Sequence, residues 1–317
     1  MTTVQYHHYL PGDEAAIVKL WNRCLTKDPI TDIRFRNLVL LDANFDPQGM
    51  RIASGDGEVI GCFYAIRRLL PMHGTELETD RGWVPFFFVD PGYRRQGVAT
   101  RLLEDATAFL RASKRDKMFF SAYAPNYVVP GVDKQAYSEA AAWLDKKGFK
   151  RMYTSVAMDY SLVDFEIPEA VRQLTEQRIA EGYTFSRARD SDLYEVIRFA
   201  TDVFNPDWGR AIREGLTQQL KLSQILVARH KGALVGFCLH GGYEGVRERF
   251  GPFGVDPSQR GKGIGKILLY ECLQLMRSQG MHGAWFLWTG EQSPAGQLYL
   301  KTGFTITRSF DIVCRSI

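Results

Sequence analysis

Two copies of one short pattern, in register with each other, constrain what this chain of 317 residues can fold into. In each copy an apolar stretch reaches an Asp-Pro turn, a loop rich in glycine and basic residues follows, and apolar residues then recur at helical spacing. The copies occupy residues 89–99 and 255–265, and Arg94 and Arg260 stand 166 residues apart. One copy would be a weak signal, because many turns before helices look like it. Two copies in register indicate an internal duplication.

The second loop has the features of an anion-binding site. A strand, a glycine loop and a helix together present backbone N–H groups and the positive end of the helix dipole to an anion. Gly263 and Gly265 let the backbone approach that anion with no side chain in the way. Arg260, Lys262 and Lys266 add positive charge. A pyrophosphate group fits these features.

The spacing excludes two common phosphate-binding motifs and matches a third. A dinucleotide-binding fingerprint needs G-x-G-x-x-G, but Leu268 stands where its third glycine would follow Gly263 and Gly265. A Walker A loop needs Ser or Thr after its lysine, where Gly263 stands. The pattern present is V-x-P followed by R-x-x-G-x-G/A, which resembles motif A of the GNAT superfamily of N-acetyltransferases. The resemblance covers nearly the whole chain and is to the tandem, two-domain type similar to mycothiol synthase-like acetyltransferases.

Motif A of this superfamily cradles the pyrophosphate of acetyl-CoA, so the resemblance implies acetyl-CoA as co-substrate and implies cofactor-binding residues in both halves. In the second half these are Phe253, Gly254, Val255, Arg260, Gly261, Lys262, Gly263, Ile264, Gly265, Lys266 and Gln292, the last at a position where the family often has Asn. In the first half they are Val89, Arg94, Arg95, Gln96, Gly97, Val98 and Ala99.

The resemblance also implies which half is catalytic. In many members a tyrosine on the helix before a terminal Gly-Phe pair protonates the leaving thiolate, and Tyr299 matches that position. The first half has Leu144 there, so only the second half carries the recognisable acid, and we expect the second half to be the catalytic one and the first to be non-catalytic. Glu248 is the candidate general base, with Glu244 as the alternative, and Glu291 is a candidate to hold the ammonium group of the acceptor. The competing interpretation is that Tyr299 fills space on an amphipathic helix and that Glu248 is a solvated turn charge.

Composition predicts a globular protein with no nucleic-acid or metal partner. The hydrophobic fraction of 45% and the charged fraction of 24% are ordinary, and a net charge of +4 is too small to indicate nucleic-acid binding. Five scattered cysteines without a C-x-x-C pair predict neither a zinc site nor a disulfide framework. Neither a secretory signal nor an apolar run of membrane-spanning length is evident. We therefore expect a cytoplasmic protein that has no membrane partner.

The periodicity predicts the element order β-α-α-β-β-β-α-β-α-β, twice. In the GNAT fold this order gives an α+β architecture, with a mixed, mostly antiparallel sheet flanked by helices in each domain. We expect a first GNAT domain at 1–162, a connecting helix at 163–182 and a second GNAT domain at 183–317. The resemblance implies that the motif strand and the strand after the motif helix run parallel and splay apart. Pro252 fits either such a break or an edge strand.

The function implied by the resemblance is transfer of an acetyl group from acetyl-CoA to a primary amine of a small molecule, by direct attack in a ternary complex. Aminoglycosides, amino sugars, polyamines and peptide amines all remain open as acceptors. The alternative is a CoA-binding regulatory module without turnover. A third interpretation treats the halves as a fused pseudo-dimer, in a monomer or homodimer, in which the first half shapes the acceptor cleft.

Overall fold

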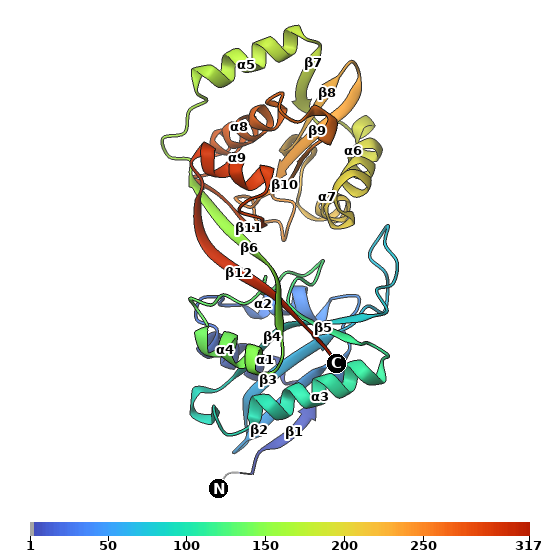
Figure 1. The fold of residues 1–317 in the computed structure, drawn as a ribbon, viewed down its shortest axis with the longest axis vertical. Coiled ribbons are helices and arrows are strands. Elements are labelled where there is room, and N and C mark those ends of the chain that lie inside the picture. Colours follow the sequence, from blue (N-terminus) through green and yellow to red (C-terminus); the bar gives the residue numbers. More distant parts are fainter. Residues whose placement is uncertain (1–2) are drawn as a thin grey trace. The chain divides into compact units, whose positions relative to one another are not determined.

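The duplicated pattern folds into two units in the computed structural model, which describes residues 3–317 (Figure 1). Unit 1 comprises residues up to Pro71, Glu76–Ser155 and Ser309–Ile317, and unit 2 comprises Met72–Thr75 and Val156–Arg308. These bounds differ from the expected 1–162 and 183–317. The physical reason is that two long strands, β6 (Lys150–Ser161) and β12 (Thr305–Ser316), each contribute one end to each unit.

Unit 1 has a sheet with helices packed on it, in the predicted element order. Its elements are β1 (Gln5–His8), α1 (Glu14–Cys24), α2 (Asp32–Phe35, continued by a π-helical turn, Arg36–Leu40), β2 (Met50–Gly55), β3 (Glu58–Ile66), β4 (Arg81–Val89), α3 (Val98–Ala112), β5 (Lys117–Phe120), α4 (Ser138–Lys146) and the start of β6. The strands follow the order β1-β2-β3-β4-β5-β12. All neighbouring pairs are antiparallel except β4 and β5.

The core of unit 1 forms where the apolar face of α1 meets β4. Trp21 is fully buried, and its ring centroid lies 4.6 Å from that of Phe86 and 5.6 Å from that of Phe88. Residues 86 and 88 share one face of the strand because side chains alternate. Burial of each such side chain stabilises the fold by about 1.5–3 kcal/mol. This packing fixes β4, whose end leads directly into the first glycine loop.

Unit 2 repeats the arrangement. Its elements are α5 (Glu169–Ala180), β7 (Tyr183–Arg187), α6 (Leu193–Phe199), α7 (Pro206–Gln218), β8 (Ile225–His230), β9 (Ala233–His240), β10 (Phe250–Val255), α8 (Ile264–Ser278), β11 (Gly283–Thr289) and α9 (Pro294–Thr302). Four strands form an antiparallel sheet in the order β10-β9-β8-β7, and β11 pairs with the end of β6. The expected connecting helix forms as α5.

The two parallel strands of each unit separate as predicted. In unit 1, β4 pairs with β5 only at Arg81–Trp83, before the last six residues of the strand. In unit 2, β10 and β11 meet at the bridge between Arg249 and Trp285. Pro252 lies in β10 beyond this bridge, which fits the separation of β10 from β11, and β10 is also the edge strand of its sheet. The pairing of β10 with β9 is interrupted at the same place. In unit 1 the separated strands border a cavity, whereas in unit 2 side chains pack closely at the start of α8.

The end of the chain completes unit 1, which the sequence pattern does not reveal. Val313 pairs with Phe120 of β5, in antiparallel register, and Phe310 and Ile312 are fully buried. The last strand was expected to close the second domain. Among residues 3–317, no helix is both long and apolar enough to cross a membrane.

Candidate active site

Both glycine loops adopt the same backbone conformation. In unit 1 the φ angles are +61° at Arg95 and +85° at Gly97, and in unit 2 they are +80° at both Gly261 and Gly263. The first N–H groups of the helix that follows have no intrahelical acceptor, so they point out from the helix start. Successive N–H groups in such a turn form a concave anion-binding surface. The backbone of each loop therefore has the conformation that the motif predicts.

The aspartates before the two loops form the turn, as expected from the Asp-Pro pairs. Asp90 Oδ1 accepts the N–H of Gly92 at 2.8 Å, and Asp256 Oδ1 accepts the N–H of Ser258 at 2.7 Å. Asp90 also forms an ion pair with Arg23 of α1. The two carboxylates therefore stabilise the turn. The loop that follows each of them is the part that is placed to bind a ligand.

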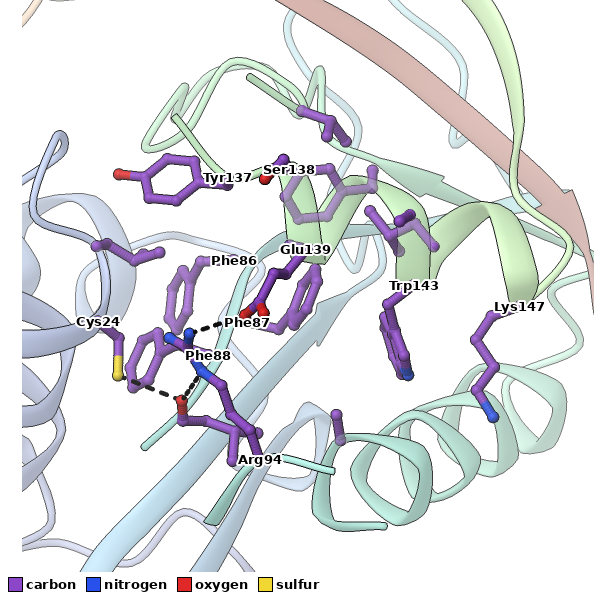
Figure 2. A pocket seen from close by; sticks show the side chains of 18 of the residues that line it. Cys24, Phe86, Phe87, Phe88, Arg94, Tyr137, Ser138, Glu139, Trp143 and Lys147 are labelled. Atoms are coloured by element: carbon purple, nitrogen blue, oxygen red, sulfur yellow. Dashed lines mark hydrogen bonds and ion pairs between the residues drawn. The ribbon is translucent and has the colours of Figure 1, made fainter. Parts of the chain in front are cut away.

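A cavity of about 900 Å³ opens beside the loop of unit 1, between the separated strands and α4 (Figure 2). Six of the seven residues predicted for this half line it, namely Val89, Arg94, Arg95, Gly97, Val98 and Ala99. The seventh, Gln96, donates its side-chain amide to the carbonyl of Gly92 at 2.9 Å. The aromatic rings of Phe87, Phe120 and Trp143 also line the cavity. A polar loop thus leads into a mostly apolar space with several aromatic rings in its wall.

Charged side chains gather where the cavity meets the loop. Arg94 Nε donates to the carbonyl oxygen of Val89 at 3.2 Å, and its Nη1 lies 3.2 Å from Glu139 Oε2. Arg95 Nη2 lies 3.2 Å from the other oxygen of Glu139. The thiol of Cys24 also faces the carbonyl of Val89, at 3.5 Å. Burial raises the pKa of this thiol, and the nearby Arg94 opposes that shift.

The loop of unit 2 is more closely packed than that of unit 1. Leu174 of α5 lies 2.6 Å from where a Cβ at Gly263 would stand, whereas among the described residues nothing lies within 4 Å of the same position at Gly97. Arg178 Nε of α5 donates to the carbonyl of Lys262 at 2.7 Å. Helix α5 therefore covers the second loop on a side that is open in the first.

The start of α8 is also closely packed. A Cβ at Gly265 would lie 3.2 Å from the ring of Phe253 and 3.6 Å from Leu298. At the corresponding place in unit 1, Ala99, Phe87 and Trp143 border the cavity instead. The residues at these positions thus border an open cavity in unit 1, whereas in unit 2 they are in contact with each other.

The remaining residues predicted for the second half lie along this loop and its flanks. Ile264 and Gly254 are buried, Val255 and Lys266 are half-buried, and Arg260, Gly261, Lys262 and Gln292 are exposed. Lys262 Nζ donates to Gln259 Oε1 at 2.9 Å. The positive charges therefore face solvent around the loop rather than an enclosed space.

Tyr299 lies inside a cluster of aromatic rings. Its side chain is 6% exposed, and its ring centroid lies 4.6 Å from Phe286, 5.4 Å from Phe304 and 5.8 Å from Phe250. Burial raises the pKa of Tyr299 well above its ordinary value. A general acid works best when its pKa is near the working pH, so this environment suits packing better than proton donation. Its role as an acid stays a prediction.

The candidate bases Glu244 and Glu248 lie just before β10, and Glu291 lies just after β11. The side chain of Glu248 is exposed, and its backbone carbonyl accepts the N–H of Trp285 at 3.1 Å. Glu244 Oε1 forms an ion pair with Arg249 Nη1 at 3.1 Å. Glu291 is exposed, and its carbonyl accepts the side-chain amide of Gln297 at 3.1 Å. Glu248 as the general base likewise stays a prediction.

Two features of the unit 1 cavity were not predicted from the sequence. Glu139 stands 45 residues after Arg94, and no local pattern links them. Tyr137 lines the cavity and donates its hydroxyl to Asp28 Oδ2 at 2.6 Å, which ties the start of α4 to the segment after α1. Among residues 3–317, no group of three His, Cys, Asp or Glu side chains is placed to hold a metal ion.

Comparison with known proteins identifies both units. The family model described as "Acetyltransferase (GNAT) family" matches residues 15–129, and the one described as "Acetyltransferase (GNAT) domain" matches residues 221–306. A protein from Saccharomonospora viridis named mycothiol acetyltransferase is 25% identical, over 90% of this chain and 94% of its own. A protein of the same name from Pseudarthrobacter chlorophenolicus is 25% identical, over 72% of this chain and 68% of its own.

Solved structures share the fold along the whole chain. A GCN5-related N-acetyltransferase from Sphaerobacter thermophilus superposes with a TM-score of 0.71 at 16% identity, covering 99% of this chain and 95% of that one. A GCN5-related glucosamine N-acetyltransferase region of a fungal multi-domain β-N-acetylglucosaminidase gives a TM-score of 0.81 at 19% identity; the match covers 99% of this chain but only 38% of the fungal one. A tandem GNAT protein from the clavulanic acid biosynthesis pathway gives 0.65 at 15% identity, covering 99% and 98%. With both units matched to one family, the chain belongs to the GNAT superfamily and is a tandem GNAT N-acetyltransferase.

Proposed function

We propose that this chain binds acetyl-CoA in the unit 1 cavity and transfers the acetyl group to a primary amine of a small molecule, by direct attack in a ternary complex. The observation that carries the proposal is the cavity of about 900 Å³ that is continuous with the glycine loop. Ligand sites commonly have volumes of about 300–1,000 Å³ and combine apolar walls with a few convergent polar groups. The unit 1 cavity has this composition.

The residues of the cavity suit the parts of acetyl-CoA. The N–H groups around Gly97 and the charges of Arg94 and Arg95 would hold the pyrophosphate. The gap between β4 and β5, walled by Phe87 and Phe120, would take the pantetheine arm. Acetyl-CoA supplies the activated thioester. The protein contributes by holding that thioester near the amine, which reduces the entropy lost on reaction.

The acceptor is proposed to be a small amine, and amino sugars are the first class to test. Support comes from the fungal structure, whose description names glucosamine. Aminoglycosides, polyamines and peptide amines are the other classes. A cytoplasmic location, and a pseudo-dimer within one chain that works as a monomer or a homodimer, are part of the proposal. The five free cysteines, four of them buried, support a reducing environment.

A second candidate places the transfer in unit 2, with Tyr299 as the acid and Glu248 as the base. The observation in its favour is that the loop at Gly261 and Gly263 has the same conformation as the loop of unit 1. In this arrangement Phe253 and Leu298 would have to move away from Gly265 to admit the pantetheine arm. The two candidates make different predictions. In the first, substitutions in the unit 1 cavity should abolish acetyl transfer, and in the second, substitutions in unit 2 should do so.

Changing Tyr299 to phenylalanine is expected to reduce turnover by less than about threefold, because the change removes only a buried hydroxyl and keeps the ring in its cluster. The measurement is thiol release from acetyl-CoA against a panel of amines. A loss on the order of a hundredfold would instead assign the chemistry to unit 2, since general acid catalysis contributes about 10²–10⁴-fold. Acetyl-CoA binding without thiol release for any amine would favour the regulatory module.

A further inference from the structure

One carboxylate engages both arginines of the unit 1 loop. Glu139 stands in the first turn of α4, on the opposite wall of the cavity from the loop, and points toward Arg94 (Figure 2). Its two oxygens are divided between the arginines, Oε2 to Arg94 Nη1 and Oε1 to Arg95 Nη2, both at 3.2 Å. The side chain therefore places a negative charge beside the surface that the loop offers to an anion.

The two arginines differ in how they are placed for this contact. Arg94 is anchored by the bond from its Nε to the carbonyl of Val89. Arg95 has a φ of +61°, a conformation that costs a residue with a side chain about 1 kcal/mol and that unit 2 gives to Gly261. The chain thus keeps a strained arginine where a glycine would be unstrained.

The ion pairs belong to the unit that has the cavity. The carbonyls of Leu144 and Tyr299 accept equivalent N–H groups just beyond their helices, from Phe149 at 3.1 Å and Phe304 at 3.0 Å. This equivalence places Pro294 of α9 where α4 has Glu139. The residue of unit 2 that corresponds to Arg95 is Gly261. Neither position of the Arg95–Glu139 ion pair therefore carries a charged side chain in unit 2.

We propose that Glu139 is a built-in counter-ion of the pyrophosphate site, which occupies the two arginines in the free protein and is displaced when a polyphosphate ligand binds. The inference rests on the proposed function of the unit 1 cavity. The contact is suited to displacement, since the side chains of Glu139 and Arg95 are 62% and 88% exposed and can turn into solvent. A ligand with several phosphate charges can engage both arginines at once, as the carboxylate does. The pair therefore favours such ligands over singly charged anions.

Replacing Glu139 with glutamine is expected to tighten acetyl-CoA binding by about three- to tenfold, because two exposed ion pairs no longer compete with the ligand. Acetyl-pantetheine, which has the same thioester arm and no phosphate, should bind the variant and the wild type equally. The measurement is calorimetric titration of the full chain with each compound. The gain for acetyl-CoA should shrink as salt is raised, because exposed charges are screened.

Asp145→Asn is the matched control. Asp145 lies on the same helix, is exposed, pairs with Lys150 and is not part of the cavity wall, and the substitution changes the net charge equally. It should leave both affinities unchanged. Melting temperatures of the two variants check that each is folded.

The outcomes separate this inference from the proposed function. If wild type binds acetyl-CoA and the Glu139→Gln variant binds it no more tightly, Glu139 is not a competitor and the inference fails alone. If Asp145→Asn tightens acetyl-CoA binding equally, only net charge matters. If Glu139→Gln tightens acetyl-pantetheine binding equally, Glu139 acts on the thioester arm. Either result also overturns the inference about Glu139. If neither wild type nor variant binds acetyl-CoA, the proposed function fails as well.

Discussion

Replacing Gly97 with valine is expected to weaken acetyl-CoA binding by about a hundredfold or more. Gly97 lines the cavity, has a φ of +85°, and a Cβ there would project into open space among the described residues. A side chain in that space would keep the pyrophosphate away from the loop N–H groups. Loss of two hydrogen bonds to a charged group costs about 3 kcal/mol or more, which is over a hundredfold in affinity. The measurement is calorimetric titration with acetyl-CoA.

Gly57→Val is the control for backbone strain. Gly57 lies in the turn between β2 and β3, has a φ of +81°, and also has open space around its Cβ position within the described chain. Both substitutions therefore carry a similar strain, of about 1–3 kcal/mol, but only one lies in the cavity. Gly57→Val should bind acetyl-CoA like wild type. If the two variants lose affinity equally, the loss reflects general destabilisation rather than the loop.

Replacing Phe310 with alanine is expected to destabilise unit 1 by about 3–5 kcal/mol, the usual cost of removing a buried phenylalanine. Phe310 is fully buried and belongs to the segment of β12 that completes unit 1. The free energy of unfolding can be measured with denaturant. Hydrogen exchange should localise the effect to β5, which pairs with this end of β12.

Ile306→Ala, on the same strand, is the matched control. Ile306 is 40% exposed and lies in the part of β12 assigned to unit 2. Its replacement should cost under about 1 kcal/mol, as is usual for surface positions. Equal costs for the two variants, or faster exchange confined to unit 2 after Phe310→Ala, would contradict the assignment of the chain end to unit 1.

The sequence predicted the parts of the fold that have local causes. Glycine spacing and the Asp-Pro turns predicted the strand, loop and helix at Arg94 and at Arg260, and both loops form with matching φ angles. Apolar runs predicted the buried strands, and the resemblance supplied the separation of the parallel pairs. Each of these features is decided by a few consecutive residues, so a single sequence contains enough information.

Features that depend on distant residues were not predictable in this way. The pairing of Val313 with Phe120 joins strands nearly 200 residues apart, and the alternating pattern of a strand does not specify which partner it takes. Packing of Leu174 over Gly263, and of Phe253 against Gly265, gives one motif two different surroundings. The motif predicts two equivalent sites, whereas the packing around it distinguishes them.

The duplication thus illustrates how a motif and a site can differ. Tyr299 satisfies the sequence pattern for an acid, yet it is buried among rings. Leu144, which breaks the pattern, borders the large cavity. The space beside the loop, rather than the number of matching residues, is what a ligand of the size of acetyl-CoA requires. This is the basis for assigning acetyl-CoA to unit 1.

The most direct test of this assignment is hydrogen exchange of the full chain with and without saturating acetyl-CoA. The N–H groups at the start of α3 have no intrahelical acceptors, so a bound pyrophosphate would protect them. We predict protection at residues 95–100 and little change at the corresponding residues 261–266. Protection confined to residues 261–266 would contradict the account and assign the acetyl-CoA site to unit 2.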